Sequence, residues 1–267
     1  MAYELIVLDL DGTLTNSQKE ISPKTKEALF RIQKEGVRVV LASGRPTPGI
    51  MPLARELCLD KHGGYILSFN GGKIINIENG RLVYNAVIPK ELIPEIYEAS
   101  RQYGTGIVTY TDDKIVLGSD PDPYIEKEQE INKIPYWKPE NFVEAIDFPV
   151  NKFLLTGEPE RMESIVEKLK EQFGEDLNIF RSEPFFIEIM PPNIDKAYSL
   201  SKLLEQLHYS RKQMICCGDG FNDISMIRYA GLGVAMANAQ PEVKAVADFI
   251  TLSNDEDGIA CVIEKFI

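Results

Sequence analysis

Two aspartates, Asp9 and Asp11, directly follow the continuous apolar run of residues 5–8. A carboxylate can attack a phosphoryl group covalently, but both groups are anionic, so a cation has to offset their repulsion. Mg²⁺ suits this task because it prefers oxygen ligands and usually takes one or two carboxylates. We therefore expect Asp9 to be both nucleophile and metal ligand, and Asp11 to be the general acid and base. An isolated acidic pair more often only starts a solvated loop, but the following Gly12-Thr13 and the preceding strand favour a site.

A second group of polar residues closes the next apolar run, residues 37–42. Ser43 offers a hydroxyl there, and Gly44 lets backbone amides approach a ligand closely. Hydroxyls and exposed amides at a strand end can bind phosphate oxygens. A Ser-Gly turn after a strand is common, so this signal is weak when taken alone.

Lys196 and an acidic loop complete the set. Lys196 stands at the start of a predicted helix, where the helix dipole disfavours a cation by roughly 0.3 to 1 kcal/mol. Neutralising a phosphoryl group and its nucleophile would explain a lysine there, although a solvated surface lysine is the alternative. Asp219 and Asp223 lie on a glycine-flexed loop after the apolar run 214–217. We expect Asp219 to be the nearer metal ligand, with Asp223 orienting waters or the loop.

The elements around these residues repeat one pattern at both ends of the chain. Residues 5–8 and 37–42 read as buried parallel strands that flank a helix, with Ser22 as its N-cap and Gly36 as its stop. Near the other end, a helix through Leu200 and Leu207 precedes a strand at 214–217, a helix from about Asp223 and a strand at about 233–237. Strand, helix, strand at this spacing predicts βαβ units.

Between residues 83 and 189 the pattern changes to short paired strands with helices at 90–101 and 159–173. Residues 109–116 read as a hairpin that turns on Asp112-Asp113. We therefore predict an α/β protein: a doubly wound, mainly parallel sheet with a Rossmann-like core and an inserted α+β cap domain. The expected division is 1–84 for the first part of the core, 85–189 for the cap and 190–267 for the second part of the core.

The composition restricts the partners. A formal net charge of −12 repels phosphate backbones, so we expect no nucleic-acid partner. No apolar run reaches ~18 residues, the N-terminal residues lack a signal-peptide pattern, and the four cysteines have no framework spacing. We expect a cytoplasmic protein that does not bind membranes. The sequence specifies no oligomeric state, and it holds no nicotinamide fingerprint.

The four clusters, in this order and spacing, resemble the haloacid dehalogenase superfamily of phosphohydrolases, and within it the Cof-like sugar phosphatases with a large C2-type cap. One small departure is Ala197, where many relatives have glycine. The resemblance implies Mg²⁺ as cofactor and an aspartyl phosphate on Asp9. It implies metal ligation by Asp9, Asp11 (through its backbone carbonyl), Asp219 and Asp223. It also implies phosphate binding by Asp9, Leu10, Ser43, Gly44, Lys196 and Asn222.

The resemblance leaves the substrate open. A sugar phosphate is the expected substrate among small phosphorylated metabolites; the alternatives are a cofactor or nucleotide, such as pyridoxal phosphate or flavin mononucleotide. Mutase chemistry in the same site, or a non-enzymatic sugar-phosphate sensor, would use the same residues. Tyr110, Asp112, Tyr124, Tyr136 and Trp137 could meet a sugar in the cap, but aromatic residues of a small domain more often belong to its core.

Overall fold

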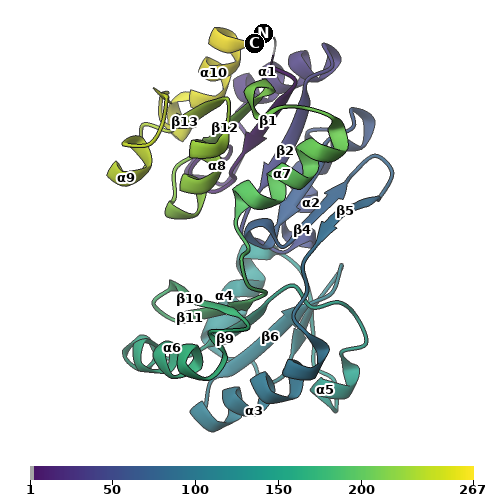
Figure 1. The fold of residues 1–267 in the computed structure, drawn as a ribbon, viewed down its shortest axis with the longest axis vertical. Helices are drawn as coiled ribbons and strands as arrows, with labels where there is room; N and C mark the ends of the chain where they lie inside the picture. Colours follow the sequence, from purple (N-terminus) through teal and green to yellow (C-terminus); the bar gives the residue numbers. More distant parts are fainter. Residues whose placement is uncertain (1–2) are drawn as a thin grey trace. The chain divides into compact units, whose positions relative to one another are not determined.

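The computed structural model describes residues 3–267, which form two compact units (Figure 1). The core unit contains residues 3–45, 50–84 and 195–267 of the described chain. The insert unit contains Pro46–Gly49 and Asn85–Ile194. No helix within residues 3–267 combines the length and the apolar character needed to cross a membrane.

The core unit is built on an eight-stranded sheet in the order β14-β13-β12-β1-β2-β3-β4-β5. Neighbouring strands from β14 to β3 are parallel, and β4 is antiparallel to β3. This confirms the predicted doubly wound, mainly parallel sheet. The strands are β1 (Leu5–Leu8), β2 (Arg38–Ala42), β3 (Tyr65–Ser68), β4 (Lys73–Asn76), β5 (Leu82–Asn85), β12 (Met214–Gly218), β13 (Leu232–Ala235) and β14 (Phe249–Ile250).

Helices cover both faces of this sheet, which explains the continuous apolar runs of its strands. Ile6 and Leu8 of β1 belong to the hydrophobic cluster that contains residues of α1, α2 and α10, whereas Leu5 and Val7 belong to the cluster with α7 and α8. A strand buried on both faces has no polar alternation. The helices are α1 (Pro23–Lys34), α2 (Thr47–Glu56), α7 (Lys196–Leu207), α8 (Ile224–Tyr229), α9 (Pro241–Lys244) and α10 (Gly258–Phe266).

Side-chain caps fix the starts of α1 and α7. Ser22 caps α1 by accepting a hydrogen bond from the Thr25 amide at 3.1 Å, as its sequence position predicts. Asp195 caps α7 by accepting one from the Tyr198 amide at 2.8 Å. Such a cap typically contributes about 1 kcal/mol. The Asp195 cap makes Lys196 the first residue of α7.

The insert unit is a six-stranded sheet in the order β10-β11-β9-β6-β7-β8, antiparallel except for the pair β7 and β8. Tyr110 pairs with Ile115 across the β6–β7 connection, which confirms the predicted hairpin. The strands are β6 (Gly106–Tyr110), β7 (Ile115–Leu117), β8 (Tyr136–Trp137), β9 (Phe153–Thr156), β10 (Asn178–Glu183) and β11 (Phe186–Met190). The helices are α3 (Ile93–Tyr103), α4 (Pro123–Asn132), α5 (Phe142–Ala145) and α6 (Pro159–Phe173).

Short 3₁₀ turns join several of these elements. They lie at Leu59–Lys61, Phe69–Gly71, Lys90–Leu92, Arg211–Gln213, Phe221–Asp223 and Asn254–Glu256. The turn Phe221–Asp223 leads directly into α8, and thereby places the predicted acidic loop between β12 and that helix.

Candidate active site

The predicted acidic residues meet at the carboxyl ends of two adjacent parallel strands. Leu8 at the end of β1 pairs with Cys217 in β12, so Asp9 and Asp219 leave the sheet side by side. Carboxylate oxygens of Asp9, Asp219 and Asp223 all lie within 4.8 Å of one another. The ends of neighbouring parallel strands are where α/β sheets bind ligands, and the sequence-based expectation rested on this rule.

Lys196 connects two of these carboxylates. Its Nζ donates hydrogen bonds to Asp9 Oδ1 and Asp223 Oδ1, both at 2.6 Å, and to the Ala42 carbonyl at 3.1 Å. Only 1% of Lys196 is exposed. Burial opposes protonation of the amine, but the charges of Asp223 and Asp9 outweigh it and raise the pKa of Lys196 above its usual value. A permanent ammonium ion therefore lies beside the expected nucleophile.

Asp9 itself is nearly buried, with 7% of its surface exposed. Burial and the charge of Asp223 raise the pKa of Asp9 well above its usual value, although Lys196 lowers it in part. The ammonium ion of Lys196 therefore offsets the effect of burial and of Asp223 on Asp9 only in part. A further cation would let Asp9 ionise fully.

The loop after β12 holds its two aspartates differently. Asp223 is fully buried, and its Oδ2 accepts the amides of Asp219 and Gly220 at 3.0 Å each. Because Lys196 binds its Oδ1, both oxygens of Asp223 are in use. Asp219 is half-buried and accepts a hydrogen bond from Thr13 Oγ1 at 2.7 Å. Burial, aided by the charge of Asp223, raises the pKa of Asp219 to about 6.

Gly12 has no side chain, and the Asp219 carboxylate occupies the space that one would fill. A Cβ atom on Gly12 would lie 2.4 Å from Asp219 Oδ2, closer than such atoms ever approach. Gly12 also has φ +87°, a conformation that residues with side chains rarely adopt. Both the backbone turn and the close approach therefore require glycine here.

Asp11 is held by two cations that sequence analysis did not assign. Arg45 donates from Nε to Asp11 Oδ2 at 2.9 Å and from a terminal nitrogen to Oδ1 at 2.6 Å, and Lys19 Nζ donates to Oδ1 at 2.8 Å. Burial favours the neutral acid, but Arg45 and Lys19 outweigh it and lower the pKa of Asp11. In this conformation Asp11 is ionised and paired.

Apart from Lys196 at the start of α7, the residues expected to bind phosphate lie in three loops of the core unit. Ser43 is buried, and its Oγ accepts the Arg45 amide at 3.2 Å. A Cβ on Gly44 would lie 3.0 Å from the Asn70 side chain, which in turn accepts a hydrogen bond from Asn222 Nδ2 at 3.0 Å. Leu10, the remaining member, has a buried side chain in the core cluster, so its main chain is the part available to a ligand.

Other residues that sequence analysis missed hold the loop after β1. Asn238 Nδ2 donates to the Gly12 carbonyl at 2.8 Å, and Asn254 Nδ2 donates to the Thr15 carbonyl at 2.9 Å. Arg45 was visible in the sequence, because it follows Ser43-Gly44. The two asparagines lie over 200 positions from their partners in the sequence, and no local sequence pattern predicts such contacts.

The donor set fits a small divalent cation. The carboxylates of Asp9 and Asp219 and the main chain beside them supply oxygen atoms, and no thiol or imidazole lies in the metal-candidate cluster found among residues 3–267. Mg²⁺ selects such oxygen ligands. Burial, aided by the charge of Asp223, raises the pKa values of Asp9 and Asp219, and a cation bound between them would offset this effect.

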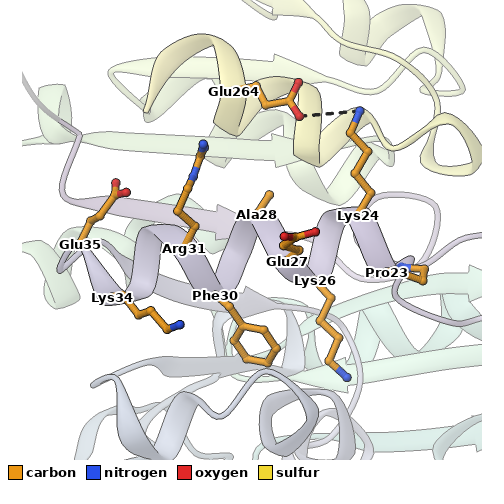
Figure 2. A pocket seen from close by; sticks show the side chains of 10 residues that line it. All are labelled: Pro23, Lys24, Lys26, Glu27, Ala28, Phe30, Arg31, Lys34, Glu35 and Glu264. Atoms are coloured by element: carbon orange, nitrogen blue, oxygen red, sulfur yellow. Dashed lines mark ion pairs between the residues drawn. The ribbon is translucent and has the colours of Figure 1, made fainter.

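A hollow of about 860 Å³ lies elsewhere on the core unit, along α1 (Figure 2). Its side chains project from both sides of the helix and carry mixed charges, including the ion pair between Lys24 and Glu264 at 3.7 Å. None of the candidate active-site residues lines this hollow. It offers no convergent set of polar groups, and we assign it no function.

The chain is similar to known proteins over almost its whole length. The family model of haloacid dehalogenase-like hydrolases matches residues 6–263. A relative from Bacillus subtilis (strain 168), named 5-amino-6-(5-phospho-D-ribitylamino)uracil phosphatase YcsE, is 31% identical over 99% of this chain and 96% of its own.

Solved structures extend the similarity. A haloacid dehalogenase-like hydrolase from Bacteroides thetaiotaomicron is 50% identical, with a TM-score of 0.96 over 99% of this chain and 100% of that chain. The protein described as the HAD subclass IIB sugar phosphatase BT4131 is 25% identical, with a TM-score of 0.79 over 98% of both chains.

Proposed function

This chain belongs to the haloacid dehalogenase-like hydrolases and is a phosphatase, and from that premise we propose that it hydrolyses a sugar phosphate through an aspartyl phosphate on Asp9, with Mg²⁺ as cofactor. The observation that carries the proposal is the buried contact between Lys196 and Asp9 at 2.6 Å. It places a fixed cation beside a carboxylate at the end of the central strand, where charge develops during phosphoryl transfer.

In the first step, an Asp9 carboxylate oxygen attacks phosphorus and the bond from phosphorus to the ester oxygen breaks. Asp11 in its acid form gives a proton to the departing oxygen, and the alcohol leaves. In the second step, Asp11 as carboxylate takes a proton from water, which attacks the phosphorus of the aspartyl phosphate. Inorganic phosphate leaves, and Asp9 and protonated Asp11 are restored.

The acid role requires Asp11 to exchange partners. Arg45 and Lys19 stabilise its ionised form in the present conformation. Substrate phosphate is the natural competitor for these cations, because guanidinium groups bind phosphate as well as carboxylate. We propose that release of Asp11 from Arg45 and Lys19 accompanies substrate binding.

The metal would be held by Asp9, Asp219 and the Asp11 carbonyl. When bound, it supplies positive charge that offsets the repulsion between carboxylate and phosphoryl group. Asp223 has both oxygens in use, so we assign it the task of fixing Lys196 and the Asp219 loop, with contact to the metal only through water. Ser43, Gly44, the Leu10 main chain, Lys196 and Asn222 would bind the phosphoryl oxygens.

Two relatives support a sugar or a related polyol as the organic part of the substrate. One is described as a sugar phosphatase, and the other is named for a phosphorylated ribityl compound. Pyridoxal phosphate, flavin mononucleotide and nucleotides are the alternatives. A screen of phosphorylated metabolites with and without Mg²⁺ distinguishes them, and a profile without any preference for sugar phosphates would contradict the sugar assignment.

The catalytic proposal has its own test. Replacing the nucleophile, Asp9→Asn, should abolish turnover of p-nitrophenyl phosphate, while Asp60→Asn, a change at an exposed position of the same unit, should leave it intact. Retained turnover in the Asp9 variant would refute the mechanism.

A further inference from the structure

The connection between β3 and β4 has an unusual backbone. These strands are adjacent and antiparallel, and the four residues 69–72 join them. Phe69, Asn70 and Gly71 have φ values of +53°, +52° and +107°, so three successive residues lie in the left-handed region. Hairpin connections of this length are most often built around a type I turn, whose central residues have negative φ. Reversal of the chain therefore does not by itself require this conformation.

Phe69 and Asn70 bear the strain of this turn, because glycine adopts positive φ freely. For a bulky residue such as Phe69 the left-handed conformation is an outlier, whereas asparagine tolerates it better than most residues. Strained backbone of this kind persists only where the surrounding structure fixes it, and it is concentrated near functional sites. The contacts of residues 69–71 must therefore compensate the strain.

Two main-chain hydrogen bonds tie the turn to the loop after β2. The Phe69 amide donates to the Arg45 carbonyl and the Asn70 amide donates to the Ser43 carbonyl, both at 3.0 Å. The side chain of Asn70 also packs against this loop, since a Cβ atom on Gly44 would lie 3.0 Å from Asn70 Nδ2. The turn and the loop that is expected to bind phosphate therefore hold one another in place.

The turn also contacts the start of α7. Ser199 is buried, and its Oγ donates a hydrogen bond to the Gly71 carbonyl. A Cβ atom on Gly71 would lie 2.6 Å from the Asp195 carbonyl oxygen, so only glycine fits there. Because α7 begins at Lys196, the turn is packed against the helix terminus that carries the ammonium ion beside Asp9.

The Asn70 side chain reaches a third loop, the one after β12. Its Oδ1 accepts a hydrogen bond from Asn222 Nδ2 at 3.0 Å. Asn222 is exposed, and an exposed side chain exchanges among rotamers unless a partner holds it, which makes its ordering by a ligand costly in entropy. A primary amide has two N–H donors, so the bond to Asn70 uses one and leaves the other for a ligand.

We propose that Asn70 is a positioning residue, which holds the Asn222 amide in the orientation that binds phosphoryl oxygens. It acts through Asn222 and does not itself touch phosphate. This inference rests on the proposed function and deepens it, because it gives the strained turn a task in phosphate affinity. All the residues that carry it belong to the core unit.

The test replaces Asn70 with glycine, which removes the side chain and leaves the left-handed backbone without strain. In the presence of Mg²⁺, Asn70→Gly should raise KM for p-nitrophenyl phosphate and the inhibition constant of inorganic phosphate about fivefold, because one neutral hydrogen bond is lost. It should change kcat less than about twofold, because Asn222 binds phosphoryl oxygens in the ground state and the transition state alike.

His208→Gly is the matched control. His208 also has a positive φ, +56°, and it lies in the core unit at the opposite end of α7 from Lys196. This change should alter neither KM nor the inhibition constant, and melting temperatures should show that each variant is folded. If Asn70→Gly does not fold, Asn70→Ala, which lacks the acceptor as well, takes its place.

A double-mutant cycle distinguishes positioning from a merely structural function. In an Asn222→Ala background, Asn70→Gly should change the inhibition constant of phosphate less than about 1.5-fold, because the group that Asn70 holds is already missing. Losses that multiply in the double variant would mark Asn70 as structural. An unchanged inhibition constant in Asn70→Gly, or a loss confined to kcat, would equally overturn the inference.

Two results separate this inference from the proposed function. If the wild type hydrolyses p-nitrophenyl phosphate but Asn222→Ala leaves the inhibition constant of phosphate unchanged, the inference fails while the phosphatase mechanism on Asp9 stands. If the wild type hydrolyses no phosphate ester with Mg²⁺, the proposed function fails and the inference with it.

Discussion

Replacing Lys196 with methionine tests the electrostatic organisation of the site. The change removes an ammonium ion that has hydrogen bonds of 2.6 Å to Asp9 and 2.6 Å to Asp223, both of them largely or fully buried. Removing one partner from a buried ion pair typically costs about 3–5 kcal/mol, because the remaining charge is left uncompensated. We expect a loss in the upper part of this range at about pH 8, since two carboxylates lose the same cation.

The cost should depend on pH with a definite sign. Burial already raises the pKa of Asp9 in the folded protein, and loss of Lys196 raises it further. Between the unfolded and the folded pKa, the folded state binds more protons, so the stability of the variant falls as the pH rises. The deficit relative to wild type should therefore be smallest near pH 4 and largest near pH 8.

Urea unfolding followed by circular dichroism, in EDTA and at about pH 5 and about pH 8, measures this difference. Lys202→Met is the matched control, because Lys202 lies on the same helix and makes a solvent-exposed pair with Glu205 at 3.4 Å. We expect the control to cost less than about 1 kcal/mol at either pH. A Lys196→Met deficit that is small or independent of pH would refute the reasoning.

Three further outcomes are expected. Without metal, the free energy of unfolding should fall as the pH rises from the usual pKa of an aspartate to about 6, because the pKa of Asp219 is raised in the folded protein. Mg²⁺ should therefore raise the melting temperature more at about pH 7 than at about pH 5. An equal gain at both pH values would contradict this. Gly12→Ala should weaken Mg²⁺ binding measured by calorimetry at least about tenfold, whereas Gly36→Ala, also at positive φ but with nothing within 4 Å, should leave it unchanged. Arg45→Met should move the alkaline limb of the kcat/KM profile to higher pH, because Asp11 acts in its acid form in the first step and its pKa then rises. The same limb in Lys19→Met should move less, and an unmoved limb in both variants would show that neither cation controls Asp11.

Much of the fold and of the core site could be predicted from sequence because local rules determine them. The run of residues 5–8 has no polar alternation, which is typical of a strand covered on both faces, and Asp9 follows it directly. The ends of parallel strands meet at one edge, so Asp219 had to lie near Asp9 once both strands were recognised. Asp195 as N-cap likewise places Lys196 at the start of α7.

The remaining contacts depend on side-chain geometry that no short pattern encodes. Lys19 reaches Asp11 from a loop in which its own φ is +63°. Lys152 and Glu188 are separated by 36 residues, and their meeting depends on the register of β9 and β11. The aromatic residues suggested for the cap included Tyr110 but gave no indication of its charged neighbours, because each glutamate and lysine looks in sequence like a surface residue.

The central claim is that Asp9 becomes phosphorylated during turnover. Acid-quenched protein, mixed for milliseconds with excess p-nitrophenyl phosphate and Mg²⁺, can be digested and its phosphorylated peptide sequenced by mass spectrometry. We predict a phosphoryl group on Asp9 that disappears in the Asp9→Asn variant. A phosphoryl group on any other residue, or product formation at full rate with an unmodified Asp9 peptide throughout the reaction, would contradict it.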